Sequence, residues 1–133
     1  MRRPDALRVR RDRGSAIAEF AMVGGLVVLL GMGIFQLALV LYVRNALISD
    51  ASEGARLGAR AGASLDEGAA RTRDLIARDL SGSYAQGVTA TRQLTSAGVQ
   101  VVEIQVSAPV PVIGLVGAGG VITVTGRAFQ EGQ

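Results

Sequence analysis

The sequence predicts an α+β fold: a single transmembrane helix extended as a stalk, a second short helix, and a small three-stranded antiparallel sheet. Three observations predict it. Residues 20–43 contain no charged side chain, Ser64 to Glu67 has the pattern of a helix start, and apolar and polar residues alternate over 102–112. The expected parts of the chain are a basic leader at 1–14, the helix and its extension at 15–62, and a small α+β domain at 63–133.

The apolar run from Phe20 to Val43 is long enough to cross a bilayer. Its 24 residues would reach about 36 Å as a helix. A buried core helix of this length would need a large soluble fold around it, and the remaining residues are too few to supply one. A secretory signal peptide also places basic residues before an apolar run. Its apolar part spans about 7 to 15 residues and ends at a small-residue cleavage site, so we expect this helix to be retained.

The basic charge of the chain is concentrated before the apolar run. Residues 1–14 hold six Arg against two Asp, whereas the rest of the chain holds eight Arg against nine acidic side chains. Arginines beside a span are typical of its cytoplasmic flank, so we expect the N-terminus in the cytoplasm and the C-terminal part outside. A nucleic-acid footprint is the weaker alternative, and no direct nucleic-acid binding is expected.

The composition argues against most kinds of catalytic site, because the chain contains no Cys and no His. Disulfides, thiolate nucleophiles, imidazole bases and zinc sites built on these ligands are therefore excluded. An enzyme would have to rely on carboxylates, and Glu103 is better explained as a solvent-facing strand residue. The glycine-rich stretch 114–120 lacks the Lys and Ser/Thr of a phosphate-binding loop. We expect no catalytic residue, no metal and no cofactor.

The most informative local feature is the carboxylate of Glu19 at the edge of the apolar run. An ionised group at this position is costly and needs a partner. If the chain were cut between Gly14 and Ser15, the new amine would lie one helical turn before Glu19. It could neutralise the carboxylate within one helix or between neighbouring helices. Alternatively, Gly14 only ends a cytoplasmic tail, and the helix dipole stabilises Glu19.

The helix is expected to continue beyond the apolar run. Small or apolar residues recur at spacings of three and four, at Leu47, Ala51, Gly54 or Ala55, and Gly58. Gly54, Gly58 and Gly62 would form a narrow ridge against which another backbone can pack. A flexible, glycine-tolerant stalk explains the same residues equally well.

The C-terminal half contains the remaining elements. Ser64 and Glu67 form the pattern of a capping box, which opens a second helix that extends to about Leu80. Strands are expected at Val88 to Leu94, over 102–112, and at Val121 to Phe129. Pro109 and Pro111 cannot donate to a ladder, so that end of the second strand should be an edge or should leave the sheet.

Two short segments carry a resemblance to a known family. Gly14, Ser15, Glu19 and Phe20 resemble the processing site of type IV prepilins, in which a membrane-embedded peptidase cuts after Gly and the fifth mature residue is Glu. The segment after the span is similar to the short signature of TadE-like proteins, the minor pseudopilins of tight-adherence (Flp) pilus systems. It comprises Glu53, Gly54, Ala55 and Arg56.

The closing segment 121–129 is also similar to that family's terminal strand, whereas two positions depart from its pattern. Family members often carry Pro where this chain has Gly24-Gly25, and often an acidic residue where it has Gln36. These departures concern the subfamily and the packing of the helix.

The resemblance implies a structural or assembly component of a tight-adherence (Flp) type IV pilus machine in the cytoplasmic (inner) membrane. The implied partners are the lipid bilayer, the prepilin peptidase, the major Flp pilin, sibling pseudopilins and the inner-membrane pilus platform. The alternative is an unprocessed, single-pass scaffolding or binding module, for which the basic residues are only a topology signal.

Overall fold

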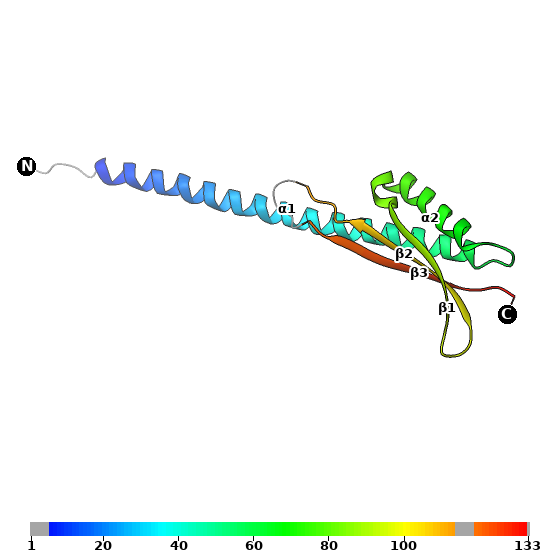
Figure 1. The fold of residues 1–133 in the computed structure, drawn as a ribbon. Helices are drawn as coiled ribbons and strands as arrows, with labels where there is room; N and C mark the ends of the chain where they lie inside the picture. The colour runs from blue at the N-terminus through cyan, green and yellow to red at the C-terminus, as the bar shows by residue number, and fades with distance from the viewer. Residues whose placement is uncertain (1–5, 114–118, 133) are drawn as a thin grey trace, which may run out of the picture. The chain divides into compact units, whose positions relative to one another are not determined.

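A computed structural model describes residues 6–113 and 119–132 of the chain. Its elements are α1 (Ala6–Gly58), α2 (Leu65–Asp79), the short 3-10 helix η1 (Gly82–Ala85), β1 (Gly87–Leu94), β2 (Gln100–Pro109) and β3 (Val121–Phe129) (Figure 1). The strands form one antiparallel sheet in the order β1-β2-β3. The predicted α+β fold is therefore confirmed: a long apolar helix, a second helix and a three-stranded antiparallel sheet.

The chain divides into two compact units, Met1–Leu37 and Ala38–Gln133. The described part of the first unit is helical, and its large apolar side chains are exposed. Phe20 is 80% exposed and Leu30 is 63% exposed. A helix whose apolar side chains face outward in every direction is typical of one surrounded by lipid or by other helices.

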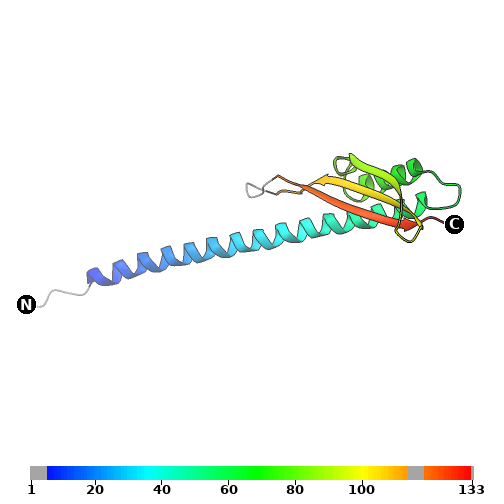
Figure 2. The same ribbon diagram turned by 60° about the horizontal axis from the view of Figure 1, so that its bottom comes forward.

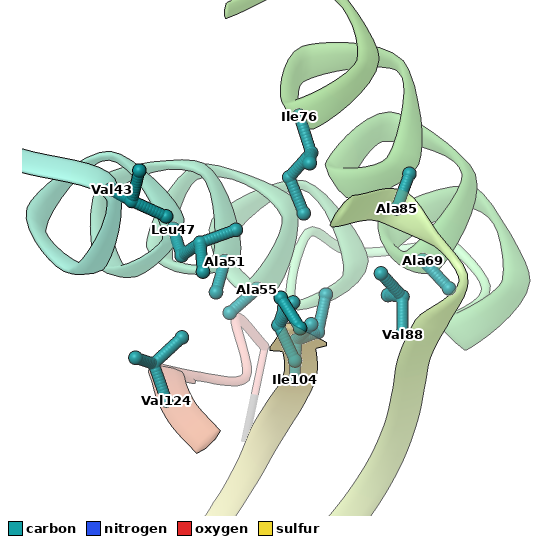
Figure 3. Close-up of a cluster of buried hydrophobic side chains, with 12 residues drawn as sticks. Val43, Leu47, Ala51, Ala55, Ala69, Ile76, Ala85, Val88, Ile104 and Val124 are labelled. Carbon is teal, nitrogen blue, oxygen red and sulfur yellow. The ribbon is translucent and has the colours of Figure 1, made fainter. Parts of the chain in front are cut away.

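The core of the second unit is formed by both helices and one face of the sheet (Figure 3). Figures 1 and 2 both show α2 and the three strands beside the last turns of α1. The core residues are Val43, Leu47, Ala51 and Ala55 of α1, Ala69 and Ile76 of α2, Ala85 of η1, Val88 of β1, Ile104, Val106 and Ala108 of β2, and Val124 of β3. The continuation of α1 beyond the apolar run thus belongs to the core of the second unit.

The glycines at the end of α1 allow α2 to approach closely. A Cβ added to Gly54 would lie 2.6 Å from the carbonyl oxygen of Gly68, and one added to Gly68 would lie 3.2 Å from the Cα of Gly58. The predicted close approach of another backbone is confirmed at Gly54 and Gly58. Gly62 has another role: α1 ends at Gly58, before the expected limit at residue 62, and Gly62 lies in the following turn with a φ of 81°.

The start of α2 has the predicted capping box. The side chain of Ser64 accepts a hydrogen bond from the backbone N–H of Glu67 at 3.1 Å. In return, the backbone N–H of Ser64 donates to Oε2 of Glu67 at 2.7 Å. The last helical residue is Asp79 and Leu80 is the C-cap, which agrees with the predicted end.

The alternating segment forms β2, the central strand. Val102, Ile104, Val106 and Ala108 are buried beneath the helices, as the alternation predicts. Pairing with β3 ends at Pro109, opposite Val121. Beyond Pro109 the chain leaves the sheet, because the two prolines cannot continue the ladder.

Candidate functional site

The predicted cleavage position lies on an open face of α1. A Cβ added to Gly14 would meet no atom within 4 Å, apart from its own helical neighbourhood, and Ser15 is exposed. The peptide bond between the two residues lies inside α1, which begins at Ala6. The missing side chain of Gly14 and the small, exposed side chain of Ser15 therefore leave this bond sterically open, while its backbone is helical.

Glu19 lies one helical turn from Ser15. The hydroxyl of Ser15 donates a hydrogen bond to Oε1 of Glu19 at 3.2 Å. The two side chains are on the same face of the helix, as their spacing of four residues requires. An amine at residue 15 would consequently lie within reach of this carboxylate. Phe20, the next residue, is exposed, and its ring is available to a neighbouring molecule.

Glu19 lies in α1. Among the helices that the structure describes, α1 alone is long and apolar enough to cross a membrane. Its exposed large apolar side chains continue as far as Leu41 and Tyr42, and the first one buried in the second unit is Val43. Membrane anchoring through this helix is consistent with its length and composition.

The segment that resembles the family signature lies where α1 packs against α2. Oε1 of Glu53 accepts hydrogen bonds from Nε and Nη2 of Arg71, at 3.1 and 2.5 Å. The hydrogen bond to Glu53 raises the pKa of the Arg71 guanidinium above its usual value. Gly54 provides the close approach to α2, and Ala55 is fully buried in the core. Three of the four residues thus connect the helices.

Arg56, the fourth residue of this segment, faces solvent. It lines an open cleft with Glu53, Leu57, Arg60 and Arg71. Arg71 is held by Glu53 and lies 3.7 Å from the carboxylate of Asp74. Among the residues that the structure describes, neither Arg56 nor Arg60 forms an ion pair, so their positive charges face the cleft.

The structure also identifies an acidic pair that the sequence did not reveal, in which Asp50 is buried and Asp79 is exposed. Asp50 of α1 is 4% exposed, and its Oδ2 is buried without a hydrogen-bond partner among the described residues. Burial and the neighbouring carboxyl of Asp79 raise the pKa of Asp50 to about 6. The available signal was spacing: Asp50 follows Leu47 by three residues and precedes Gly54 by four, on the inward face of α1.

The described residues contain no group of three or more acidic side chains arranged to hold a metal ion. The two clusters above contain a carboxylate pair and an arginine-lined cleft. Neither places a nucleophile beside a general base, the arrangement on which covalent catalysis depends.

The comparisons with known proteins bear on the first half of the chain. A family model described as TadE-like protein matches residues 14–56. The match begins at the predicted cleavage position and ends at Arg56, so it includes both segments that predicted the family and excludes the closing segment 121–129. Neither the comparison with curated proteins nor that with solved structures found a match. Residues 14–56 of this chain are a TadE-like family domain.

Proposed function

We propose that the chain is a pseudopilin, a structural or assembly component of a tight-adherence (Flp) pilus machine. The TadE-like match over residues 14–56 supports the class. The observation that carries the proposal is the placement of Glu19 one turn after Ser15, at the start of an exposed apolar helix. This arrangement brings a new N-terminus at residue 15 close to the carboxylate that needs a partner.

In this proposal, residues 1–14 are a cytoplasmic leader and the apolar helix crosses the inner membrane. A prepilin peptidase hydrolyses the bond between Gly14 and Ser15. The freed amine of Ser15 then donates to Glu19 in place of the hydroxyl. The new hydrogen bond is stronger, because the amine is charged. The mature helix packs beside the major Flp pilin, sibling pseudopilins and the inner-membrane platform, and the C-terminal part lies outside.

The segment from Glu53 to Arg56 has a structural role in this proposal. Glu53 pairs with Arg71, and Gly54 allows the close approach of α2, so both residues hold α2 against the last turns of α1. The proposed role is non-enzymatic, which the TadE-like match supports.

One observation favours the alternative of an unprocessed, single-pass scaffolding module. α1 continues without interruption from Ala6 through Gly14. In that case the basic segment is the first part of the membrane helix and remains on the mature protein. The two functions differ in the mass of the native chain.

Intact-mass measurement decides between them. The chain is expressed with a matching prepilin peptidase, and the wild type should lose residues 1–14. Gly14→Val should block the cut, because a β-branched side chain would crowd the scissile bond. Gly31→Val is the matched control: it makes the same change in the same helix, at another glycine with open surroundings.

Cleavage of the wild type and Gly31→Val, but not of Gly14→Val, supports the pseudopilin. A wild type that keeps residues 1–14 in the presence of active peptidase supports the unprocessed scaffold instead. As a control, cleavage of a known prepilin in the same membranes shows that the peptidase is active.

A further inference from the structure

We propose that the sheet end formed by Val112, Ile113 and Val121 is a second membrane contact, seated in the boundary between headgroups and acyl chains. We call these three residues the apolar foot. The proposal rests on the proposed insertion of α1 in a bilayer. It adds that the exposed domain lies against the outer surface of the same membrane.

An open cavity of about 410 Å³ is lined both by residues of the foot and by residues at the end of the apolar run. Its lining residues are Leu39, Tyr42 and Val43 of α1, Asp79 and Leu80 at the end of α2, Tyr84 of η1, and Pro111, Val112 and Ile113 after β2. Leu39 to Val43 are the last residues of the uncharged run. The segment after β2 therefore lies level with the last turn of the predicted span.

The foot is apolar and open to its surroundings. Val112 is 39% exposed, Ile113 is 51% exposed, and Val121, which pairs with Pro109 at this end of the sheet, is 69% exposed. Residues 104–126 contain no charged side chain. A charge-free sheet end with several exposed aliphatic side chains is unusual for a surface that meets only water.

Charge returns at the other end of the sheet. Glu103 and Arg127 pair across β2 and β3 at 2.5 Å. Glu103 is six residues from Pro109 along β2, which corresponds to about 20 Å of strand. The sheet therefore has an apolar end level with the end of the span and a charged end far from it.

The aromatic side chains at the cavity are those expected at a membrane surface. The chain has two tyrosines, and both Tyr42 and Tyr84 line this cavity. Tyr is enriched at the interface between membrane and water, because its ring is apolar and its hydroxyl is polar. Asp79, on the same wall, favours a shallow position over a deep one, because a carboxylate requires water or headgroups.

The backbone near the foot also suits this environment. A segment that enters the interface must satisfy its N–H groups without bulk water. Pro109 and Pro111 have no N–H, and the N–H of Val110 donates to the carbonyl oxygen of Gly120 at 2.9 Å. Residues 109–111 therefore leave no backbone N–H that needs a hydrogen-bond acceptor from the membrane interface.

Tryptophan fluorescence can test the contact directly, because the chain contains no Trp. Ile113→Trp reports on the foot. Leu94→Trp is the matched control, a substitution at an exposed apolar residue in β1, opposite Gln100 at the charged end of the sheet. Leu30→Trp, in the middle of the apolar run, reports on the span itself. Each full-length variant is reconstituted in phosphatidylcholine vesicles that contain nitroxide-labelled lipid, with the label either shallow or deep.

We expect Ile113→Trp to emit at shorter wavelength than Leu94→Trp, and to be quenched more by the shallow label than by the deep one. This pattern corresponds to a depth of about 5–10 Å into the boundary between headgroups and acyl chains. Leu94→Trp should be quenched by neither label. Val121→Trp gives a second reading of the foot if the substitution at residue 113 disturbs folding, which circular dichroism would reveal.

Three results would overturn the inference. If Leu30→Trp is quenched by the deep label while Ile113→Trp and Val121→Trp are not, α1 spans the bilayer and the foot is clear of it. If Leu30→Trp is not quenched either, the proposed insertion itself fails. If the blue shift at residue 113 disappears when the protein is diluted with excess lipid, a second copy of the chain covers the foot instead of lipid.

Discussion

The carboxyl of Asp50, buried on α1, lies beside the carboxyl of Asp79, the last residue of α2. Two ionised carboxylates at close range repel each other, so their proximity favours the protonated form of Asp50. Burial, Asp79 and the charge of Glu53 all raise the pKa of Asp50, to about 6. The contact between the helices at this point is consequently sensitive to pH.

The first prediction concerns stability. Because the folded state raises the pKa of Asp50 above its ordinary value of 3.8, folding takes up a proton between about pH 4 and pH 6. The contribution of Asp50 to the free energy of unfolding is fully present below pH 4 and is lost as the pH rises through about 6. A shift of this size sets a ceiling of about 3 kcal/mol on the loss.

Asp50→Asn should remove this dependence and stabilise the protein at pH 7.5, because the amide is neutral and can donate to Asp79. The measurement is denaturant unfolding of the full chain in mild detergent, from pH 4 to pH 7.5. Asp74→Asn, at a largely exposed carboxylate of α2, is the control. Parallel pH profiles for the wild type and Asp50→Asn would contradict the prediction.

The second prediction concerns the close approach of the helices. Gly54→Ala should destabilise the second unit by about 1–3 kcal/mol, because the added methyl group meets Thr72 and the carbonyl of Gly68. Gly33→Ala is the matched control: it lies in the same helix, and its Cβ would meet nothing within 4 Å. Thermal unfolding followed by circular dichroism compares the two, and equal midpoints would show that α2 can move aside at no cost.

The third prediction separates processing from assembly. Glu19→Gln keeps the shape of the side chain and removes its charge, so insertion and cleavage should survive while recovery of the major pilin falls. If the carboxylate pairs with the Ser15 amine of a neighbouring subunit, the loss amounts to a few kcal/mol or less, since desolvation offsets the attraction. Quantitative pull-down in mild detergent measures it, with cleavage checked by mass on the same samples.

Ser15→Ala is the control for Glu19→Gln. It removes the hydroxyl that donates to Glu19 but keeps the amine that cleavage would create, so recovery of pilin should be preserved. Equal recovery with the wild type and Glu19→Gln, at equal cleavage, would leave Glu19 as a self-paired or helix-start carboxylate.

The fourth prediction concerns topology. The arginines of residues 1–14 should stay in the cytoplasm, and the chain from Asn45 onward should lie outside. Protease added to intact spheroplasts should therefore digest the C-terminal part, whereas a cytoplasmic marker protein should remain whole. Protection of the C-terminal part in intact spheroplasts, with digestion after lysis, would indicate the opposite orientation.

The sequence alone was sufficient wherever the determining interactions are local. The length of the apolar run, the capping box of Ser64 and Glu67, and the alternation along β2 each depend on residues within a few positions of one another. Local periodicity establishes which face of an element is apolar. For the same reason, the prolines correctly predicted that this end of the second strand leaves the sheet, although the alternation continues to residue 112 and β2 ends at Pro109.

Only the tertiary structure decided which faces meet, because those contacts join residues distant in the chain. The spacing of Gly54, Gly58 and Gly62 is regular, yet the first two contact α2 and the third lies in a turn with a positive φ. Asp50 is an ordinary polar residue in the sequence, and only the fold buries it and brings Asp79 beside it. Tyr42 and Tyr84 line one cavity because η1 follows α2 back toward the end of the apolar run. Periodicity specifies the faces of single elements, whereas packing selects the partner of each face.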